Sequence, residues 1–203
     1  MNIRSNITIS DQIQQTLTDQ IVRGELAPDE KLRQDHIAKD FNTSHVPVRE
    51  ALLRLEARGL AVSIPRRGVR VAPFHASDIL EIKAMRLALE PVALRHAIPK
   101  MTAADLARIK TAQQACDDAG DLLTWEQTNR QFHRAILVPC MMPLLLSTID
   151  KLQVLGARHL LATWRSTWEG RTDRDHSAIW TAIIRKDSDT AVSVLKKHLQ
   201  RLG

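Results

Sequence analysis

Three histidines in the second half of the sequence have the chemistry of metal ligands. His133 follows Asn129 by four residues in the stretch WEQTNRQFHRAIL, so both side chains share one face of a predicted helix. His176 and His198 each share a helical face with aliphatic residues of their own segments. Imidazoles that converge from separate helices with a side-chain oxygen can bind Zn²⁺, Ni²⁺ or Mn²⁺. Spacing leaves open the alternative of three separate core histidines, each with a local hydrogen bond.

A second candidate group is basic and lies earlier in the sequence. Between Arg49 and Arg70, six arginines stand against two glutamates in 22 residues, whereas the whole chain carries a formal charge of +6. Such a local excess suits an anionic partner such as DNA, although a solvated basic surface is the ordinary alternative. The elements that hold these arginines therefore decide between the two interpretations.

The stretch SHVPVREALLRLEARGL places a proline inside a predicted helix. Ser44 is expected to cap this helix with its hydroxyl. Pro47 then falls in the first turn, where an N–H group has no intrahelical acceptor and the proline ring stiffens the helix start. Aliphatic residues at helical spacing form the buried face, which leaves Arg49 and Arg54 facing outward.

The surrounding residues predict a compact unit over residues 8–73. A first helix begins near Ser10, its expected cap, and ends at Gly24, and a short second helix follows. Apolar residues alternate on both sides of the stretch PRRG, which predicts a β-hairpin. Helix-turn-helix proteins place the second of two such helices in the major groove, and the hairpin would form a wing. Arg66 and Arg67 at its tip would reach the DNA backbone or the minor groove.

From residue 77 onward the hydrophobic periodicity is helical throughout. The absence of tyrosine and an aromatic content of only 3% also favour helices over a strand-rich fold. The expected fold class is mostly α: a winged helix-turn-helix of three helices and a β-hairpin, followed by an all-helical antiparallel bundle over 77–201. The predicted bundle helices cover residues 77–97, 102–118, 121–137, 141–163, 172–186 and 188–201.

Cysteine content and hydropathy indicate the compartment. Cys116 and Cys140 lack metal-type spacing and are typical of buried, reduced thiols. The longest apolar stretch, AILVPCMMPLLLSTI, is too short to span a bilayer, and the N-terminus lacks a signal-peptide core. We expect a cytoplasmic protein with no membrane association.

The stretch LRQDHIAKDFNTSHVPVREALLRLEARGLAVSIPRRGVRVAPF resembles the winged helix-turn-helix of the GntR family of bacterial transcription regulators, over about residues 8–73. Shared features include the run Pro-Val-Arg-Glu-Ala-Leu from Pro47 and the pair Arg67-Gly68. The family usually has arginine where this chain has His45, so the DNA contact at that step differs from the family pattern. The resemblance implies DNA contacts from Arg33, Ser44, His45, Val46, Pro47, Arg49, Arg54, Arg66, Arg67 and Gly68.

Residues 77–201 resemble the FCD domain, the helical effector domain of one GntR branch, through the stretches MRLALEPVALRHA and NRQFHRAI. This resemblance implies a divalent metal, Zn²⁺, Ni²⁺ or Mn²⁺, and a small carboxylate effector beside it. Asparagine in place of the commoner aspartate removes one negative charge, so we expect a lower metal affinity. Arg86 is a candidate effector ligand, but an intrahelical pair with Glu90 is an equal alternative. The implied residues are Asn129, His133, His176 and His198 for the metal, and Arg86 and Arg130 for the effector.

Together these features predict a transcription regulator that binds palindromic operator DNA as a homodimer and responds to a carboxylate metabolite. A repressor is the expected type, and an activator is the alternative that the sequence leaves open. It is not expected to be an enzyme. The alternative is a metal-dependent, hydrolase-like enzyme with a DNA-binding appendage, although Glu126, the nearest candidate general base, lies seven residues before His133. A non-specific DNA-packaging protein would need denser basic charge.

Overall fold

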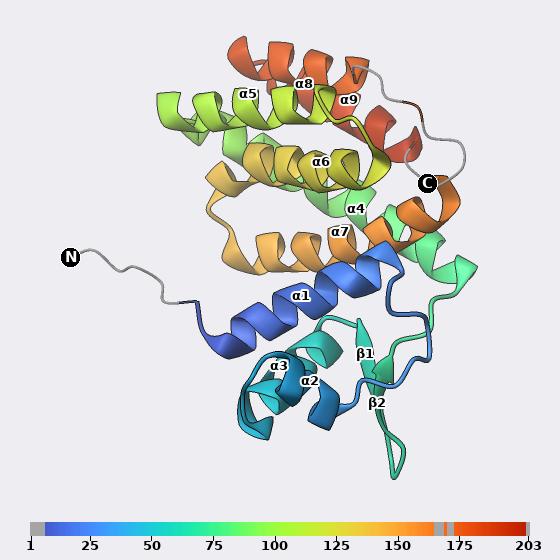
Figure 1. Ribbon diagram of the computed structural model, residues 1–203. Coiled ribbons are helices and arrows are strands. Elements are labelled where there is room, and N and C mark those ends of the chain that lie inside the picture. The colour runs from blue at the N-terminus through green and yellow to red at the C-terminus, as the bar shows by residue number, and fades with distance from the viewer. Residues whose placement is uncertain (1–6, 165–168, 170–172, 202–203) are drawn as a thin grey trace, which may run out of the picture. The chain divides into compact units, whose positions relative to one another are not determined.

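The computed structural model describes residues 7–164, 169 and 173–201. The chain divides into two compact units, Met1–His75 and Ala76–Gly203 (Figure 1). Among the described residues, no helix is both long and apolar enough to cross a membrane.

Over its described residues, 7–75, the N-terminal unit contains three helices and a hairpin, as the hydrophobic pattern predicts. Helix α1 packs against α3, and their buried aliphatic side chains form the core of the unit. Ile13 and Ile21 contribute from α1, and Leu52 and Leu55 from α3, all at most 2% exposed. The elements are α1 (Ile9–Arg23), α2 (Gln34–Asp40), α3 (His45–Ala57), β1 (Ala61–Ile64) and β2 (Gly68–Val71).

Two expected helix caps differ in the structure. Helix α1 is capped by Thr8 rather than Ser10, which is buried inside the helix. The Thr8 hydroxyl accepts from the Asp11 backbone N–H (3.2 Å), and the Asp11 carboxylate accepts from the Thr8 N–H (3.0 Å). This reciprocal pair satisfies two otherwise unpaired N–H groups, which a serine without its acidic partner cannot do. Ser44 does occupy the N-cap position of α3, but its side chain makes no capping hydrogen bond.

The hairpin is antiparallel, with Ala61 opposite Val71 and Ile64 opposite Gly68. A third segment extends it: the Leu32 N–H donates to the Val69 carbonyl, and the Val71 N–H donates to the Glu30 carbonyl, both at 2.9 Å. The sequence did not predict this pairing, because the stretch DEKL lacks the alternation of a half-buried strand.

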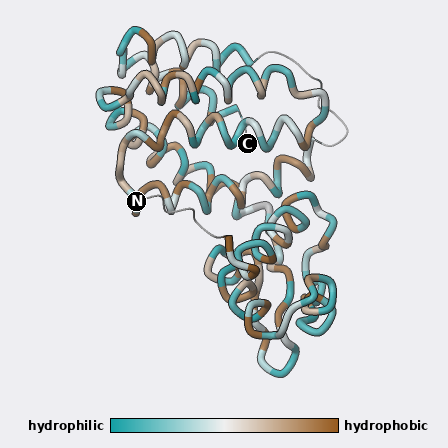
Figure 2. Tube along the Cα trace, turned by 60° about the vertical axis from the view of Figure 1, so that its left-hand side comes forward, coloured by the Kyte–Doolittle hydropathy of each residue, from teal (hydrophilic) through white to brown (hydrophobic). Residues whose placement is uncertain are grey.

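The C-terminal unit is helical over its described residues. Helix α4 packs against α7 and α9, while α5 packs against α6 and α8 against α9. Each of these helices carries both hydrophobic and hydrophilic residues along its length (Figure 2). The elements are α4 (Ala76–Ala97), η1 (Ile98–Lys100), α5 (Ala103–Asp117), α6 (Leu122–Leu137), η2 (Val138–Cys140), α7 (Pro143–Trp164), α8 (Arg174–Ile184) and α9 (Ser188–Arg201). The first two residues of the predicted 172–186 helix lie outside α8, and residue 172 is outside the described residues. The predicted fold class is confirmed.

Candidate functional site

The first turn of α3 presents an exposed polar and apolar surface. Val48, Ala51 and Leu52 are buried against the core, which turns the opposite face of the helix to solvent. Arg49 lies on that exposed face, and Val46 keeps 67% of its surface accessible. An exposed helix start with hydrogen-bond donors and an apolar group can read base edges in a major groove.

Two of the expected DNA-contacting side chains have partners within the same unit. His45 Nε2 lies 3.7 Å from Asp35 Oδ1 on α2. The Arg54 guanidinium forms an ion pair with the Asp11 carboxylate, which ties α3 to the start of α1. Both pairs are solvent-exposed, so they add little stability and can open toward another anion.

The remaining expected residues of this surface lie on the hairpin tip and before α2. Arg66, Arg67 and Gly68 are exposed, and Arg33 occupies the exposed N-cap position of α2. The Arg67 N–H donates to the Ile64 carbonyl at 2.9 Å, which closes the turn. Arg66 has a left-handed φ of 62°, as the third residue of a type II turn requires. The turn therefore places two exposed arginines at the tip of the hairpin.

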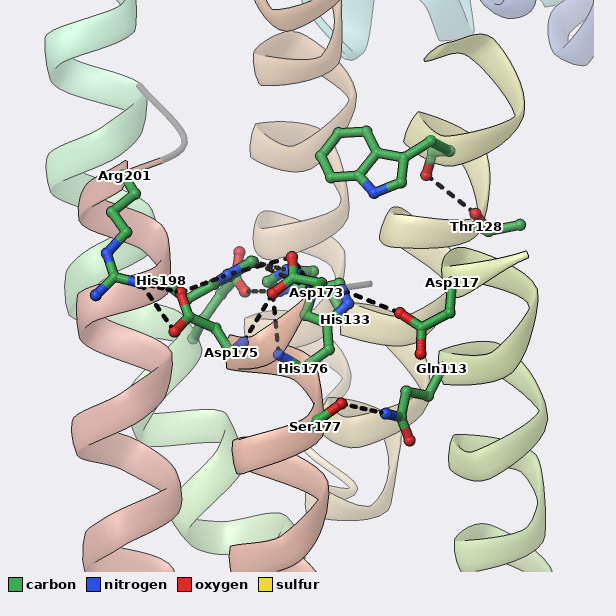
Figure 3. A network of polar contacts seen from close by, with 12 residues as sticks. Gln113, Asp117, Thr128, His133, Asp173, Asp175, His176, Ser177, His198 and Arg201 are labelled. Carbon is green, nitrogen blue, oxygen red and sulfur yellow. Dashed lines mark hydrogen bonds and ion pairs between the residues drawn. The ribbon is translucent and has the colours of Figure 1, made fainter. Parts of the chain in front are cut away.

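In the helical unit, the structure brings the three candidate histidines together from α6, α8 and α9 (Figure 3). The His133 and His198 Nε2 atoms are 3.2 Å apart, and those of His176 and His198 are 3.3 Å apart. One ring nitrogen of each histidine lies within 4.8 Å of the other two. All three residues are buried, with at most 2% of their surface exposed.

Carboxylates lie beside the outer nitrogens of two of these rings. His133 Nδ1 is 2.8 Å from Glu90 Oε2, and His198 Nδ1 is 3.5 Å from Asp175 Oδ2. A carboxylate only accepts hydrogen bonds, so the 2.8 Å contact with Glu90 favours a proton on His133 Nδ1, whereas the 3.5 Å separation at His198 is an ion-pair distance. Burial, together with the nearby His133 ring, lowers the pKa of His198 to about 4, and burial also lowers the pKa of His176. These two rings are therefore neutral near pH 7, as metal ligands must be.

The inward-facing nitrogens fit a divalent metal. Two imidazole nitrogens bound to one ion at about 2.0–2.1 Å lie roughly 2.8–3.4 Å apart for bond angles between about 90° and 109°. The separations of His198 Nε2 from His133 and from His176, 3.2 and 3.3 Å, fall in this range, and the nitrogens of His133 and His176 lie within 4.8 Å of each other. The contact between His133 Nε2 and His198 Nε2 is a hydrogen bond only when one of the two nitrogens carries a proton.

Asn129, the fourth expected ligand, lies one turn before His133 on α6 and is buried. Among the described residues, its Oδ1 atom has no hydrogen-bond partner, and neither has His176 Nδ1. A buried amide oxygen without a donor is costly unless a ligand or cation satisfies it. Asn129 and His133 both line one cleft.

This cleft encloses about 570 Å³, including its open mouth, between residues of α4, α6, α7 and α9. Both expected effector-binding arginines line it. Arg86 Nε donates to Glu90 Oε1 at 2.7 Å, the intrahelical pair considered from the sequence, and Arg130 Nε donates to Glu126 Oε1 at 2.6 Å. Each guanidinium is thus held by a buried carboxylate at the wall of the cleft.

Glu90 also belongs to this site, although the sequence suggested for it only an intrahelical ion pair with Arg86. Its carboxylate is fully buried and also contacts His133 and the Gln153 side-chain amide, which donates to Oε1 at 3.2 Å. Burial alone would raise the pKa of Glu90, but the charge of Arg86 and the contact with His133 hold it well below its usual range. A buried glutamate one turn after an arginine is a signal that could have pointed to this role.

Asp173 and Asp175 were also missed, because nothing in their spacing relates them to His198. The Asp173 side chain caps α8 by accepting from the backbone N–H groups of Asp175 (2.9 Å) and His176 (3.2 Å). Asp175 accepts from Arg201 Nη1 at 2.7 Å. These contacts hold both carboxylates beside the histidine cluster (Figure 3).

Two family models match the chain, one in each compact unit. The model described as "Bacterial regulatory proteins, gntR family" matches residues 9–71. The model described as "FCD domain" matches residues 81–201. The first match covers the helix-turn-helix surface, and the second covers the histidine cluster.

Curated relatives and solved structures agree with these matches. The "HTH-type transcriptional repressor GlaR" of Escherichia coli (strain K12) is 29% identical over 196 residues, covering 90% of this chain and 89% of the relative. The "HTH-type transcriptional regulator McbR" of the same organism is 30% identical over 152 residues, covering 73% of this chain and 69% of the relative. The solved structure "E. coli McbR/YncC" has a TM-score of 0.83 at 25% identity and covers 96% of this chain and 94% of its own.

Proposed function

The chain belongs to the GntR family of bacterial regulatory proteins and carries an FCD domain, and we propose from this premise that a small carboxylate, bound beside a divalent metal, controls its affinity for operator DNA. As a GntR-family chain with relatives named as HTH-type transcriptional regulators and repressors, it is a DNA-binding transcription regulator. The hydrolase-like alternative is not retained, because the matching families and named relatives are regulators rather than enzymes.

In this proposal, residues 8–73 bind the operator. The start of α3 enters the major groove, where Arg49 and Val46 contact base edges, and the wing arginines contact the backbone or the minor groove. Support comes from the exposure of this helix face and from the projecting tip of the hairpin. Two copies of the chain related by a two-fold axis would present two such helices to a palindromic site.

Residues 77–201 bind the effector and form the dimer in the same proposal. His133, His176 and His198 hold the metal, and the Asn129 oxygen completes the donor set. When bound, a divalent ion would supply positive charge to the cleft and leave coordination positions for a carboxylate. Arg86 and Arg130 add guanidinium donors on the cleft wall, so the cleft favours an anion with two or more acceptor oxygens.

The observation that carries the proposal is that the buried His198 Nε2 lies 3.2 Å from His133 Nε2 and 3.3 Å from His176 Nε2, which join three helices at one point. Effector binding changes DNA affinity only if the effector favours one arrangement of the two DNA-binding units over another. The connection between the two compact units, around His75, must therefore transmit the difference.

The experiment compares His133→Ala with His159→Ala, a control that removes a histidine of the same cleft outside the triad. Elemental analysis after dialysis against Ni²⁺ or Zn²⁺ should find metal in the wild type and in His159→Ala, and none in His133→Ala. Equal metal content in all three proteins would reject the site.

The second half of the experiment tests the effector. Thermal-shift screening of small carboxylates with the metal-loaded protein should identify compounds that raise the melting temperature. The same compounds should change operator affinity in a titration at fixed salt. If compounds stabilise the protein but leave operator affinity unchanged, ligand binding in the cleft does not control DNA binding.

A further inference from the structure

One buried carboxylate contacts both a proposed metal ligand, His133, and a proposed effector ligand, Arg86. Glu90 Oε2 lies 2.8 Å from His133 Nδ1, and Glu90 Oε1 accepts from Arg86 Nε at 2.7 Å. The Glu90 side chain is completely buried, so no water competes for its oxygens from the surface. Gln153 on α7 donates a further hydrogen bond to Oε1 at 3.2 Å, which fixes the plane of the carboxylate.

The contact with His133 selects one form of its ring. A neutral imidazole carries its proton on either Nδ1 or Nε2, and an ionised carboxylate only accepts hydrogen bonds. Glu90 therefore favours the proton on Nδ1. The Nε2 lone pair is then free to face His198 Nε2, 3.2 Å away, whereas a proton on Nε2 would block the position of a metal.

The contact with Arg86 fixes a guanidinium at the cleft. The pair spans one turn of α4, and the Arg86 side chain is 14% exposed where it lines the cleft. Glu90 uses the Nε donor, so the two terminal amino groups of the guanidinium retain donors for another anion. A fixed guanidinium binds a carboxylate with a smaller entropy loss than a mobile one.

We propose that Glu90 is the positioning residue that joins the metal-binding and anion-binding halves of the site. It holds His133 in the tautomer that binds a metal through Nε2, and it holds Arg86 at the wall of the cleft. This inference rests on the proposed function for its metal and carboxylate, but the state of the His133 ring can be measured without either. Loss of the Glu90 charge should weaken metal and carboxylate binding together.

Glu90→Gln is the direct test, because the amide has the same shape but cannot accept from every neighbour. Both Arg86 and Gln153 donate to one oxygen, and His133 donates to the other. If the amide NH₂ faces His133, the ring must move its proton to Nε2. If it faces Arg86, two donors meet and the guanidinium shifts.

Glu126→Gln is the matched control. Glu126 and Arg130 form the same kind of pair, a buried carboxylate and a half-buried guanidinium, across one turn of α6 in the same cleft. Both ring nitrogens of His133 are already within hydrogen-bonding distance of Glu90 and His198. A change in cleft charge alone would affect both variants, whereas a change in the His133 ring affects only Glu90→Gln.

The first measurement is the ¹⁵N NMR spectrum of the imidazoles in the metal-free protein. We expect the Nδ1–H form of His133 in the wild type and in Glu126→Gln, and a shift toward the Nε2–H form in Glu90→Gln. The wild-type spectrum is decisive by itself if a variant fails to fold. An Nε2–H tautomer of His133 in the wild type overturns the proposal.

The second measurement is Ni²⁺ titration calorimetry on the full chain. Affinity should fall about 10- to 100-fold in Glu90→Gln and remain at the wild-type level in Glu126→Gln. Equal affinities in all three proteins overturn the role of Glu90. If the wild type binds no Ni²⁺, the metal assignment of the proposed function fails, and the ring tautomer still decides whether Glu90 positions His133.

Discussion

The candidate residues of the two units differ in their exposure to solvent and in the partners of their polar groups. On α3 and the hairpin, the arginines and His45 are exposed, and the proposed partner is a molecule outside the chain. In the helical unit, the histidines and Glu90 are buried and contact one another. Exposed polar groups can change with little effect on stability, whereas a buried polar network is costly when it is only partly satisfied. We therefore expect the proposed DNA surface to be separable from folding, and the proposed effector site to be coupled to it.

The largest expected effect is on the stability of the helical unit. Glu90→Ala leaves the half-buried Arg86 and the buried His133 without their shared acceptor, and we expect the free energy of unfolding to fall by about 3–5 kcal/mol. All four tryptophans lie between residues 125 and 180, so urea unfolding followed by tryptophan fluorescence reports on this unit. Arg49→Ala is the control and should change stability by less than about 0.5 kcal/mol. Equal effects of the two variants would contradict the difference between the units.

Metal binding should add stability only through the histidine cluster. Ni²⁺ at about 100 times its dissociation constant should raise the free energy of unfolding by about 2.7 kcal/mol, because it binds the folded state. The same fluorescence experiment measures this gain. His198→Ala removes the ring that lies between the other two and should abolish it. A similar gain in this variant would mean that the ion binds elsewhere.

Arg49→Ala should affect DNA recognition instead of stability. Loss of a base contact in the major groove should cost about 1–3 kcal/mol of operator binding. Titration at fixed salt with an operator selected from random sequences measures this loss. Arg95→Ala, which removes an exposed arginine from the helical unit, should retain wild-type affinity. Unchanged binding by Arg49→Ala would reject α3 as the recognition helix.

The smallest expected effect is at the tip of the wing. A phosphate contact carries no sequence information, so Arg67→Ala should weaken binding equally to operator and to unrelated DNA. The slope of log affinity against log salt should become shallower by about 1. Titrations at several salt concentrations measure that slope for both DNAs. A loss confined to the operator would instead assign a base contact to Arg67.

Most of the fold could be predicted from local patterns. Helix positions in both units follow from the spacing of aliphatic residues, and the stretch PRRG between two alternating segments predicts the hairpin. The predicted cap of α1 was wrong. Thr8 rather than Ser10 caps this helix, because Asp11 completes a reciprocal pair of hydrogen bonds with Thr8. The strand-like pairing of Leu32 with Val69 has no periodic signal, since it depends on an edge that only the folded hairpin provides.

By itself, the sequence determined which residue types face each helical surface, because side chains three and four positions apart lie on one face whatever the helix packs against. It therefore placed each histidine on an apolar face. Only the tertiary structure decided that the rings of His133, His176 and His198 meet, and that Glu90 contacts His133 from α4. These contacts join residues 22 to 65 positions apart, and their distances depend on how the helices pack.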